Sequence, residues 1–106
     1  PDLSADVRQI RSQLGAGECA RLMQVDTSLI HRWAASGTVP VAHRRRVSDL
    51  KLIGDIFCAV GTPEIARRWM NAMNPALNYE TPSDEILRGR WVATIAVARD
   101  YVSPPN

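Results

Sequence analysis

The spacing of apolar positions along the chain predicts helices and no strands. Apolar residues recur at every third or fourth position, and no segment keeps the alternation of apolar and polar residues that a half-buried strand needs. A first helix is expected over 4–14, with Ser4 as its cap and Gly15 at its end. A longer helix is expected from Val41 to about Val60, as the central strut of an all-α fold. Its inward positions are Val47, Leu50, Ile53, Ile56, Phe57 and Val60.

Two proline-containing segments predict helix starts in the second half of the chain. In Thr62-Pro63 and in Thr81-Pro82, a threonine that can accept a backbone N–H bond precedes a proline, which is favoured at the first helical position. A last helix is expected at about 90–102, with Val92, Ile95, Ala96 and Arg99 at helical spacing. The second half is thus expected to form three short helices.

Residues 18–33 have the order of residue types that is typical of a helix-turn-helix. Ala20 is the small residue where two helices would cross, and Val25 would fill the turn between them. Ile30 and Trp33 are three residues apart on the second helix and share one face, which can pack back on the first helix. The segment therefore predicts two short helices that are joined by a tight turn and packed on each other.

The second helix of this pair has an outward face that is suited to DNA. Either Asp26 or Thr27 is expected to cap the helix. Gln24 stands where such motifs often carry glycine, which is unfavourable if the turn needs a left-handed backbone. A recognition helix presents the side chains near its start to base edges in the major groove. Here those side chains are Thr27, Ser28, His31 and Arg32. The alternative is a helix pair with a purely structural role.

A basic segment follows the helix-turn-helix. It consists of His43, Arg44, Arg45 and Arg46. We expect its three arginines to contact DNA phosphates, which orient a protein without reading sequence, and the alternative is a solvated basic turn. Residues 1–53 carry eight Arg or Lys and five acidic residues, whereas residues 54–106 carry five and six. The basic excess therefore lies in the same half as the helix-turn-helix, where phosphate neutralisation would use it.

Length and composition are typical of one compact globular domain, or of two very small ones that share a core. The chain has 106 residues, of which 45% are hydrophobic and 23% charged. No run approaches the roughly 20 apolar residues of a membrane helix, and the first residues lack the pattern of a signal peptide. Cys19 and Cys58 lie in apolar helical patterns and are expected to be buried free thiols, which suits a cytoplasmic protein.

The sequence offers no support for catalysis. It contains no glycine-rich phosphate loop, no carboxylate pair with acid–base spacing, and no cysteine or histidine cluster with zinc spacing. We therefore expect a protein that is not an enzyme and that needs no cofactor or metal.

The segment from Trp69 to Gly89 carries a motif that resembles a known family. The motif residues are Trp69-Met70, Asn74-Pro75-Ala76-Leu77, Thr81-Pro82, Ile86-Leu87 and Gly89. Their order is similar to that in the toxin-binding domain of the Xre/MbcA/ParS-type antitoxins, in which a helix-turn-helix also precedes this domain. The motif residues themselves are expected to form turns, caps and core contacts, and not to be the residues that contact the toxin. Asn78-Tyr79-Glu80 replaces a turn that often contains glycine, which leaves the backbone of this turn open.

The resemblance implies two regions and a protein partner. Residues 1–53 would form the DNA-binding region, and residues 54–106 would form the toxin-binding domain. Family members are antitoxins of type II toxin–antitoxin pairs, and their usual partner is a RES-domain toxin that consumes NAD or transfers ADP-ribose from it. The antitoxin covers the active-site entrance of the toxin, and its helix-turn-helix binds operator DNA to repress the operon.

The resemblance places the toxin contacts in the last helix and tail. Trp91 stands where small or acidic residues are common in the family and is expected as an exposed interface anchor. Asp100 and the terminal carboxylate of Asn106 would meet basic groups of a pocket that holds phosphates. The candidate contacts are Arg88, Arg90, Trp91, Arg99, Asp100, Tyr101 and Asn106. The choice among them stays open, as does the alternative that each is a solvated surface residue.

Two other functions fit the same sequence. One is a stand-alone helix-turn-helix repressor whose second half only mediates dimerisation, and the other is an adaptor that binds neither DNA nor toxin. A DNA-binding protein of this size usually dimerises to span two half-sites, so we expect a homodimer or a larger toxin–antitoxin hetero-oligomer. Salt-sensitive DNA affinity would separate the adaptor from the other two functions.

Overall fold

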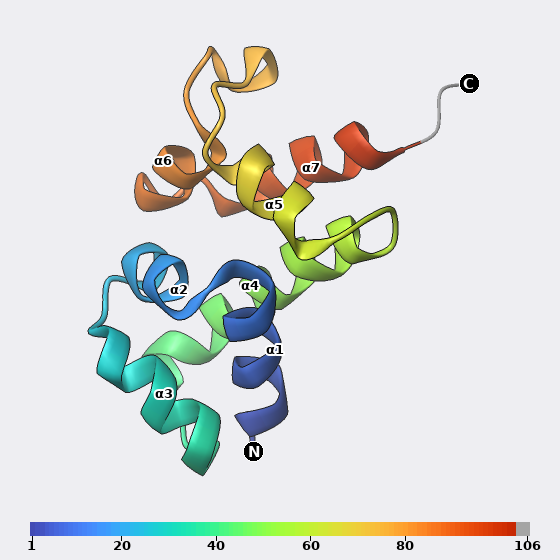
Figure 1. Cartoon of the computed structure of the whole chain (residues 1–106). Helices are drawn as coiled ribbons and strands as arrows, with labels where there is room; N and C mark the ends of the chain where they lie inside the picture. Colours follow the sequence, from blue (N-terminus) through green and yellow to red (C-terminus); the bar gives the residue numbers. More distant parts are fainter. Residues whose placement is uncertain (104–106) are drawn as a thin grey trace.

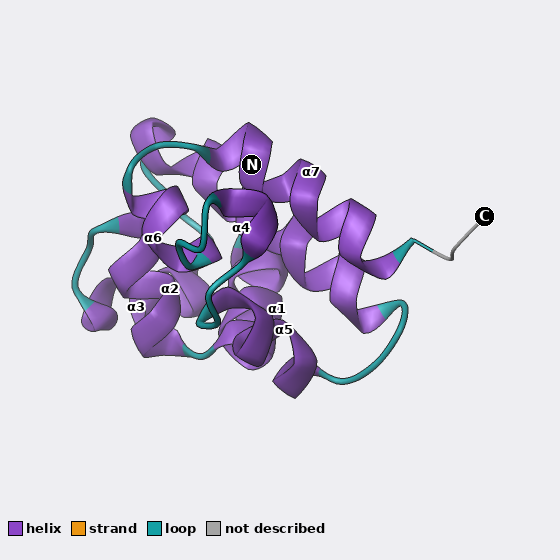
Figure 2. Ribbon diagram, turned by 90° about the horizontal axis from the view of Figure 1, so that it is seen from above, coloured by secondary structure: helices purple, strands orange, loops and turns teal. Residues whose placement is uncertain are grey.

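Every regular element in the computed structural model, which describes residues 1–103, is a helix. The elements are α1 (Ser4–Leu14), α2 (Ala16–Met23), α3 (Thr27–Ser36), α4 (Val41–Cys58), α5 (Pro63–Met70), the 3-10 helix η1 (Pro75–Leu77), α6 (Pro82–Leu87) and α7 (Trp91–Val102). Figure 1 shows α1, α2 and α3 grouped around the first part of α4, with α5, α6 and α7 stacked beyond them. Figure 2 shows that short loops connect the helices. The predicted all-α fold with a long central helix is confirmed.

The central helix α4 packs on helices from both halves of the chain. It contacts α1, α5 and α7, and its buried apolar residues include Leu50, Ile53 and Phe57. One continuous cluster of buried apolar side chains contains residues from all seven α-helices. The boundary expected at residue 53 therefore falls within α4, and the assignment of separate roles to the two regions stays a prediction.

The end of α4 differs from the predicted pattern. The helix ends at Cys58, and Val60 lies beyond it with 55% of its surface exposed. Cys58 is exposed, whereas Cys19 is buried and its thiol donates to the carbonyl oxygen of Ile10 over 3.3 Å. Burial raises the pKa of the Cys19 thiol to about 12. The expectation of a buried thiol is correct for Cys19 and wrong for Cys58, because the inward face of α4 ends at Phe57.

The proline-containing segments begin helices at the predicted positions. In α6, Thr81 Oγ1 accepts a backbone N–H bond of 3.1 Å from the first turn, and Pro82 is the first helical residue. In α5, Pro63 is likewise first, but the side chain of Thr62 makes no capping hydrogen bond. Proline position therefore predicted both helix starts, whereas the threonine cap forms at one of them.

The caps of α1 and α3 differ from the predicted ones. Ser4 is the first residue of α1 and not its cap, because its backbone N–H donates to Asp2 Oδ1 over 2.9 Å. This hydrogen bond lowers the pKa of the Asp2 carboxyl. At α3, Asp26 occupies the cap position with an extended backbone, but its side chain makes no capping hydrogen bond.

The motif between α5 and α6 is built from turn, cap and core residues, as predicted. Asn74 Oδ1 accepts a backbone N–H bond of 2.9 Å from two residues later, which caps η1. Leu77, at the end of η1, is buried. Asn78 and Tyr79 follow with φ angles of 56° and 66°, the left-handed region that glycine adopts more readily. The turn thus keeps a backbone suited to glycine although it contains none.

Two side-chain contacts tie the second half of the chain to the first. Arg67 on α5 donates to the carbonyl oxygens of Ser12, over 2.9 Å, and Gln13, over 3.1 Å. These carbonyls lie in the last turn of α1, where a helix leaves its carbonyl groups without intrahelical partners. Ser83 on α6 donates to Glu18 on α2 over 2.9 Å. The two halves are therefore joined by polar contacts as well as by the shared core.

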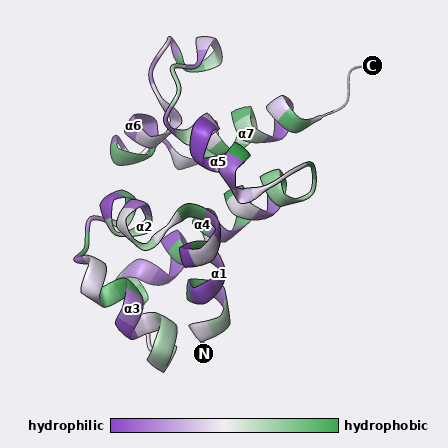
Figure 3. Ribbon diagram, viewed as in Figure 1, coloured by the Kyte–Doolittle hydropathy of each residue, from purple (hydrophilic) through white to green (hydrophobic). Residues whose placement is uncertain are grey.

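The last helix, α7, is hydrophobic along much of its length (Figure 3), and its exposed residues include the apolar Val92. Its inward residues are Trp91, Thr94, Ile95 and Ala98. Of the residues noted at helical spacing, Ile95 is buried, whereas Val92 is 75% exposed.

Candidate nucleic-acid and partner-binding surfaces

The turn between α2 and α3 is closed by a left-handed residue. Gln24 has φ 58° and ψ 46°, and its N–H donates to the carbonyl of Arg21. The N–H of Val25 donates to the carbonyl of Ala20 over 3.0 Å. These two bonds form a Schellman motif, which satisfies the free carbonyls at the end of α2. The turn therefore does require a left-handed backbone at position 24, and a glutamine adopts this conformation in place of glycine.

The outward face of α3 is the one that the sequence predicts. Ile30, Trp33 and Ala34 are buried against the rest of the fold. The four residues proposed to meet DNA are all exposed: Thr27, Ser28, His31 and Arg32. A helix with this division presents polar side chains and one guanidinium to solvent along a single face.

Arg44 lies on the same surface as this face. Arg32, His43 and Arg44 line a concavity of about 600 Å³ between α3 and the start of α4. The ring of His43 stacks at 5.4 Å on the ring of buried Trp33, and Arg44 Nε donates to the carbonyl of Val39 over 2.9 Å. These contacts hold two basic side chains beside α3.

Arg45 and Arg46 do not line this concavity and lie on a different surface. Both bind the buried carboxylate of Asp49, over 3.4 and 3.1 Å, and Arg46 lies over the ring of Trp91 at 4.5 Å. Together with Arg90 they line a concavity beside α7. The structure thus divides the three arginines predicted as one phosphate-binding set, because successive residues on a helix point about 100° apart.

Helix α1 supplies basic residues that the sequence analysis did not identify. Arg11 Nη1 lies 3.2 Å from His31 Nδ1, which places a guanidinium beside the outward face of α3. Arg8 Nη1 donates to the carbonyl of Ala34 over 2.9 Å and so holds the last turns of α3. The spacing of Arg8 and Arg11 on α1 gave no sign of this, because the contacts join residues 20 or more positions apart.

Two of the proposed partner contacts, Arg88 and Arg90, are bound to a buried glutamate. Each donates to Glu85 over 2.9 Å, and Arg88 also pairs with Glu80 over 3.2 Å. Burial of the Glu85 carboxylate opposes its ionisation, but the hydrogen bonds from Arg90 and Arg88 outweigh that effect and hold its pKa below the ordinary value. These arginines therefore have a structural role at the junction of α6 and α7, although about half of each side chain remains exposed.

Trp91 is not the exposed anchor that the sequence predicts. Only 6% of its surface is exposed, and the guanidinium of Arg46 covers its ring. Trp91 begins α7 and faces the core, because it lies on the same face of that helix as the buried Thr94, Ile95 and Ala98. Its large apolar ring is therefore part of the core and is not available as an exposed contact.

The other end of α7 offers a separate group of candidates. Arg99 and Asp100 are exposed, and Tyr101 is 62% exposed while its ring packs near Phe57 and Trp69 at 5.9 and 6.3 Å. At 1.5 Å per residue, this end lies roughly 15 Å along the helix from Trp91. Asn106 lies outside the described residues. The proposed partner contacts thus fall at two ends of one helix and do not form a single patch.

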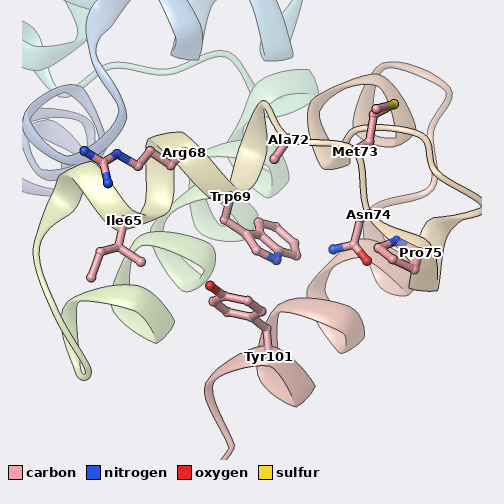
Figure 4. A pocket seen from close by; sticks show the side chains of 8 residues that line it. All are labelled: Ile65, Arg68, Trp69, Ala72, Met73, Asn74, Pro75 and Tyr101. Atoms are coloured by element: carbon pink, nitrogen blue, oxygen red, sulfur yellow. The ribbon is translucent and has the colours of Figure 1, made fainter.

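A groove that the sequence did not predict lies between α5, the turn after it and the end of α7. It has a volume of about 440 Å³, and its walls include Arg68, Trp69, Met73 and Tyr101 (Figure 4). Met73 is 74% exposed. Only Tyr101 was a candidate from the sequence, because the walls of the groove come from segments about 30 residues apart and no local pattern brings them together.

Within residues 1–103, no group of three or more His, Cys, Asp or Glu side chains is placed to hold a metal ion. None of the helices described there is long and apolar enough to cross a membrane.

Comparison with solved structures gives a match over almost the entire chain. The fold is similar to that of a chain in the crystal structure of the M. tuberculosis MbcT–MbcA toxin–antitoxin complex, with a TM-score of 0.76 and 22% sequence identity. The match covers 98% of this chain and 99% of that one. No family model and no curated protein sequence matches the chain. The resemblance inferred from the motif between Trp69 and Gly89 is thus confirmed at the level of the fold.

Proposed function

We propose that this chain is the antitoxin of a type II toxin–antitoxin pair. Its second half binds and neutralises the toxin, and its first half binds operator DNA to repress the operon. The observation that carries the proposal is the likeness, over nearly the whole of both chains, to a chain crystallised within a toxin–antitoxin complex. Such a likeness over both halves supports one function for the whole chain more than it supports an unrelated role for either half.

The partner we propose is a RES-domain toxin, which the antitoxin inhibits by covering the active site. The motif from Trp69 to Gly89, which resembles that of antitoxins with such partners, supports this assignment. The exposed end of α7 is the surface we assign to the contact, with Arg99, Asp100 and Tyr101 as its side chains. Arg88 and Arg90 are weaker candidates for contacts with the toxin, because Glu85 already binds both guanidinium groups.

The proposed DNA surface is the outward face of α3 together with the start of α4. Thr27, Ser28, His31 and Arg32 are exposed there, and Arg44 lies beside Arg32. Arg32 would contact a base edge, and Arg44 would contact a phosphate. Two copies of the chain would be needed to span two half-sites, and DNA binding implies a cytoplasmic location.

The test is co-expression of this chain with the product of the adjacent reading frame. The proposal predicts a stable complex that does not consume NAD, beside a free partner that does, and a growth defect that this chain relieves. If no complex forms and the chain still binds its own upstream DNA tightly and salt-dependently, it is a stand-alone repressor. If it binds neither, both functions are excluded.

A further inference from the structure

The groove between α5 and α7 contains a buried hydrogen-bond donor without a partner among residues 1–103. Trp69 is only 6% exposed, and its Nε1–H makes no hydrogen bond within that range. Figure 4 shows that the nitrogen of the indole ring faces the space between the side chains of Asn74 and Tyr101. A buried tryptophan N–H usually has an acceptor, because leaving the group unpaired costs the free energy of its lost hydration. The groove therefore lacks an acceptor at a defined point.

The walls of the groove have the composition of a protein interface core. Trp69, Met73, Tyr101 and Arg68 belong to the residue types that are enriched where proteins meet. Met73 and Tyr101 expose 74% and 62% of their surfaces, so the groove offers apolar area that the chain itself does not cover. Ile65 and Pro75 extend this apolar lining at either side.

The charge at the groove is positive. Arg68 is the one charged residue among the side chains that line it, and 78% of that side chain is exposed. Its ion pair with Glu64 over 2.8 Å lies in solvent, where such pairs contribute little to stability, and it occupies one of the five N–H donors of the guanidinium. A carboxylate beside the groove would therefore find a cation, and a carbonyl within it would find the N–H of Trp69.

We propose that this groove seats an extended segment of the toxin in which an apolar residue is adjacent to an acidic one. The apolar side chain lies against the rings of Trp69 and Tyr101, a backbone carbonyl accepts the hydrogen bond of Trp69 Nε1, and the carboxylate pairs with Arg68. The proposal rests on the proposed function, because it takes the toxin as the partner. It adds a contact surface on α5 and the following turn to the one at the end of α7.

Entry of the segment requires a small change at the rim. The indole nitrogen has no solvent contact in this conformation, and the ring of Tyr101 lies 6.3 Å from that of Trp69. Tyr101 is in the last turns of α7 and is mostly exposed, so its side chain can change rotamer at little cost. Rotamer changes of this kind are common when proteins bind.

The test uses the full chain and the adjacent gene product, with three variants. Trp69→Phe removes the N–H donor and keeps an aromatic ring, although the phenyl ring is smaller than the indole, and Met73→Glu places a negative charge at an exposed position of the groove. Val92→Glu is the control, because Val92 is equally exposed on α7 but lies outside the groove. We expect Kd for the toxin to rise about fivefold to tenfold in Trp69→Phe. It should rise at least as much in Met73→Glu and not change in Val92→Glu.

A second measurement reports on the indole N–H itself. In a nitrogen-15 correlation spectrum, the Trp69 indole resonance, assigned by its loss in Trp69→Phe, should shift and gain protection from exchange when the toxin binds. If the wild-type complex forms while both groove variants bind as tightly as wild type and this resonance is unchanged, the groove proposal is wrong and the antitoxin function stands. A loss of binding confined to Val92→Glu would also overturn it. Absence of any wild-type complex would overturn both proposals.

Discussion

Gln24 shows how a single residue can meet a backbone requirement that its side chain does not favour. Its left-handed conformation closes α2 and turns the chain toward α3. For a residue with a Cβ atom this conformation costs about 1 kcal/mol or more, which the Schellman hydrogen bonds and the packing of α3 offset. Asn78 and Tyr79 carry the same kind of cost in the turn before α6.

Glycine at position 24 should therefore stabilise the protein. For Gln24→Gly we expect the free energy of unfolding to rise by about 0.5–1 kcal/mol, because the relief of left-handed strain exceeds the entropic cost of glycine. Urea denaturation would measure the change. Ala96→Gly is the control, because Ala96 is exposed within the regular part of α7. That variant should lose about 1 kcal/mol, and a loss in both variants would show that strain at Gln24 is not significant.

The two arginines of the proposed DNA surface should differ in what they recognise. Arg32→Ala is expected to weaken binding to the operator by about 1–3 kcal/mol and to weaken binding to unrelated DNA much less, since it removes a base contact. Arg44→Ala should weaken both to a similar degree and reduce the salt dependence of binding. Fluorescence anisotropy at several salt concentrations would measure this. Arg99→Ala, at the far end of α7, is the control. Equal loss on both DNAs for Arg32→Ala would make it a phosphate contact.

At the scale of elements, the sequence predicted the buried face of a helix best where apolar residues occur mainly on one side of that helix. In α3, and in α4 from Val47 to Phe57, the apolar positions lie mainly on one face, and the helices bury that face, whereas Val41 and Cys58 at the ends of α4 are exposed. In α7 apolar or small residues occupy most positions from Trp91 to Ala98, so the period alone could not choose between a face with Trp91 and a face with Val92. The packing of α7 on α4 determines which face is buried, and this packing cannot be predicted from the local sequence of α7 alone.

The junction of α6 and α7 should make stability depend on pH through Glu85. The pKa of its carboxyl is lowered in the folded protein, so the stability that its ionised form contributes is fully present above the unfolded pKa, near 4.3, and is lost as the pH falls from there through the lower folded pKa. Glu85→Gln should therefore be less stable than wild type at pH 7, and this difference should shrink below pH 4.5 or so. Thermal unfolding from pH 3 to pH 7 would measure it. Glu64→Gln, which removes an exposed ion pair, is the control and should follow the wild-type profile.

At the scale of the whole molecule, the features that escaped the sequence are those that join distant segments. The fold class, the helix starts at Pro63 and Pro82 and the exposed face of α3 follow from local spacing and local chemistry. The groove between α5 and α7 and the hydrogen bonds of Arg67 could not be predicted in this way, because each depends on how α5 packs against helices far from it in the sequence. Arg67 and Arg68 are neighbours with similar sequence context and have different structural roles.

Those two neighbours provide a matched test of how the halves are joined. Arg67→Met should lower the free energy of unfolding by about 1–2 kcal/mol, because two carbonyl groups at the end of α1 lose their donors. Arg68→Met should change it by no more than about 0.5 kcal/mol, as expected for an exposed ion pair. Chemical denaturation followed by circular dichroism would measure both. Equal effects would mean that water replaces the guanidinium of Arg67 without cost.

The continuous core along α4 has a practical consequence for anyone who wishes to separate the two proposed functions. A cut between residues 53 and 54 would divide α4 near its C-terminal end and leave Leu50 and Ile53 on one fragment and Phe57 on the other, each with its apolar surface newly exposed to water. Such fragments would tend to aggregate, so failure of either one to bind would carry no information about where binding occurs. The two activities can be dissected in this chain by point substitutions on intact protein, and not by domain deletion.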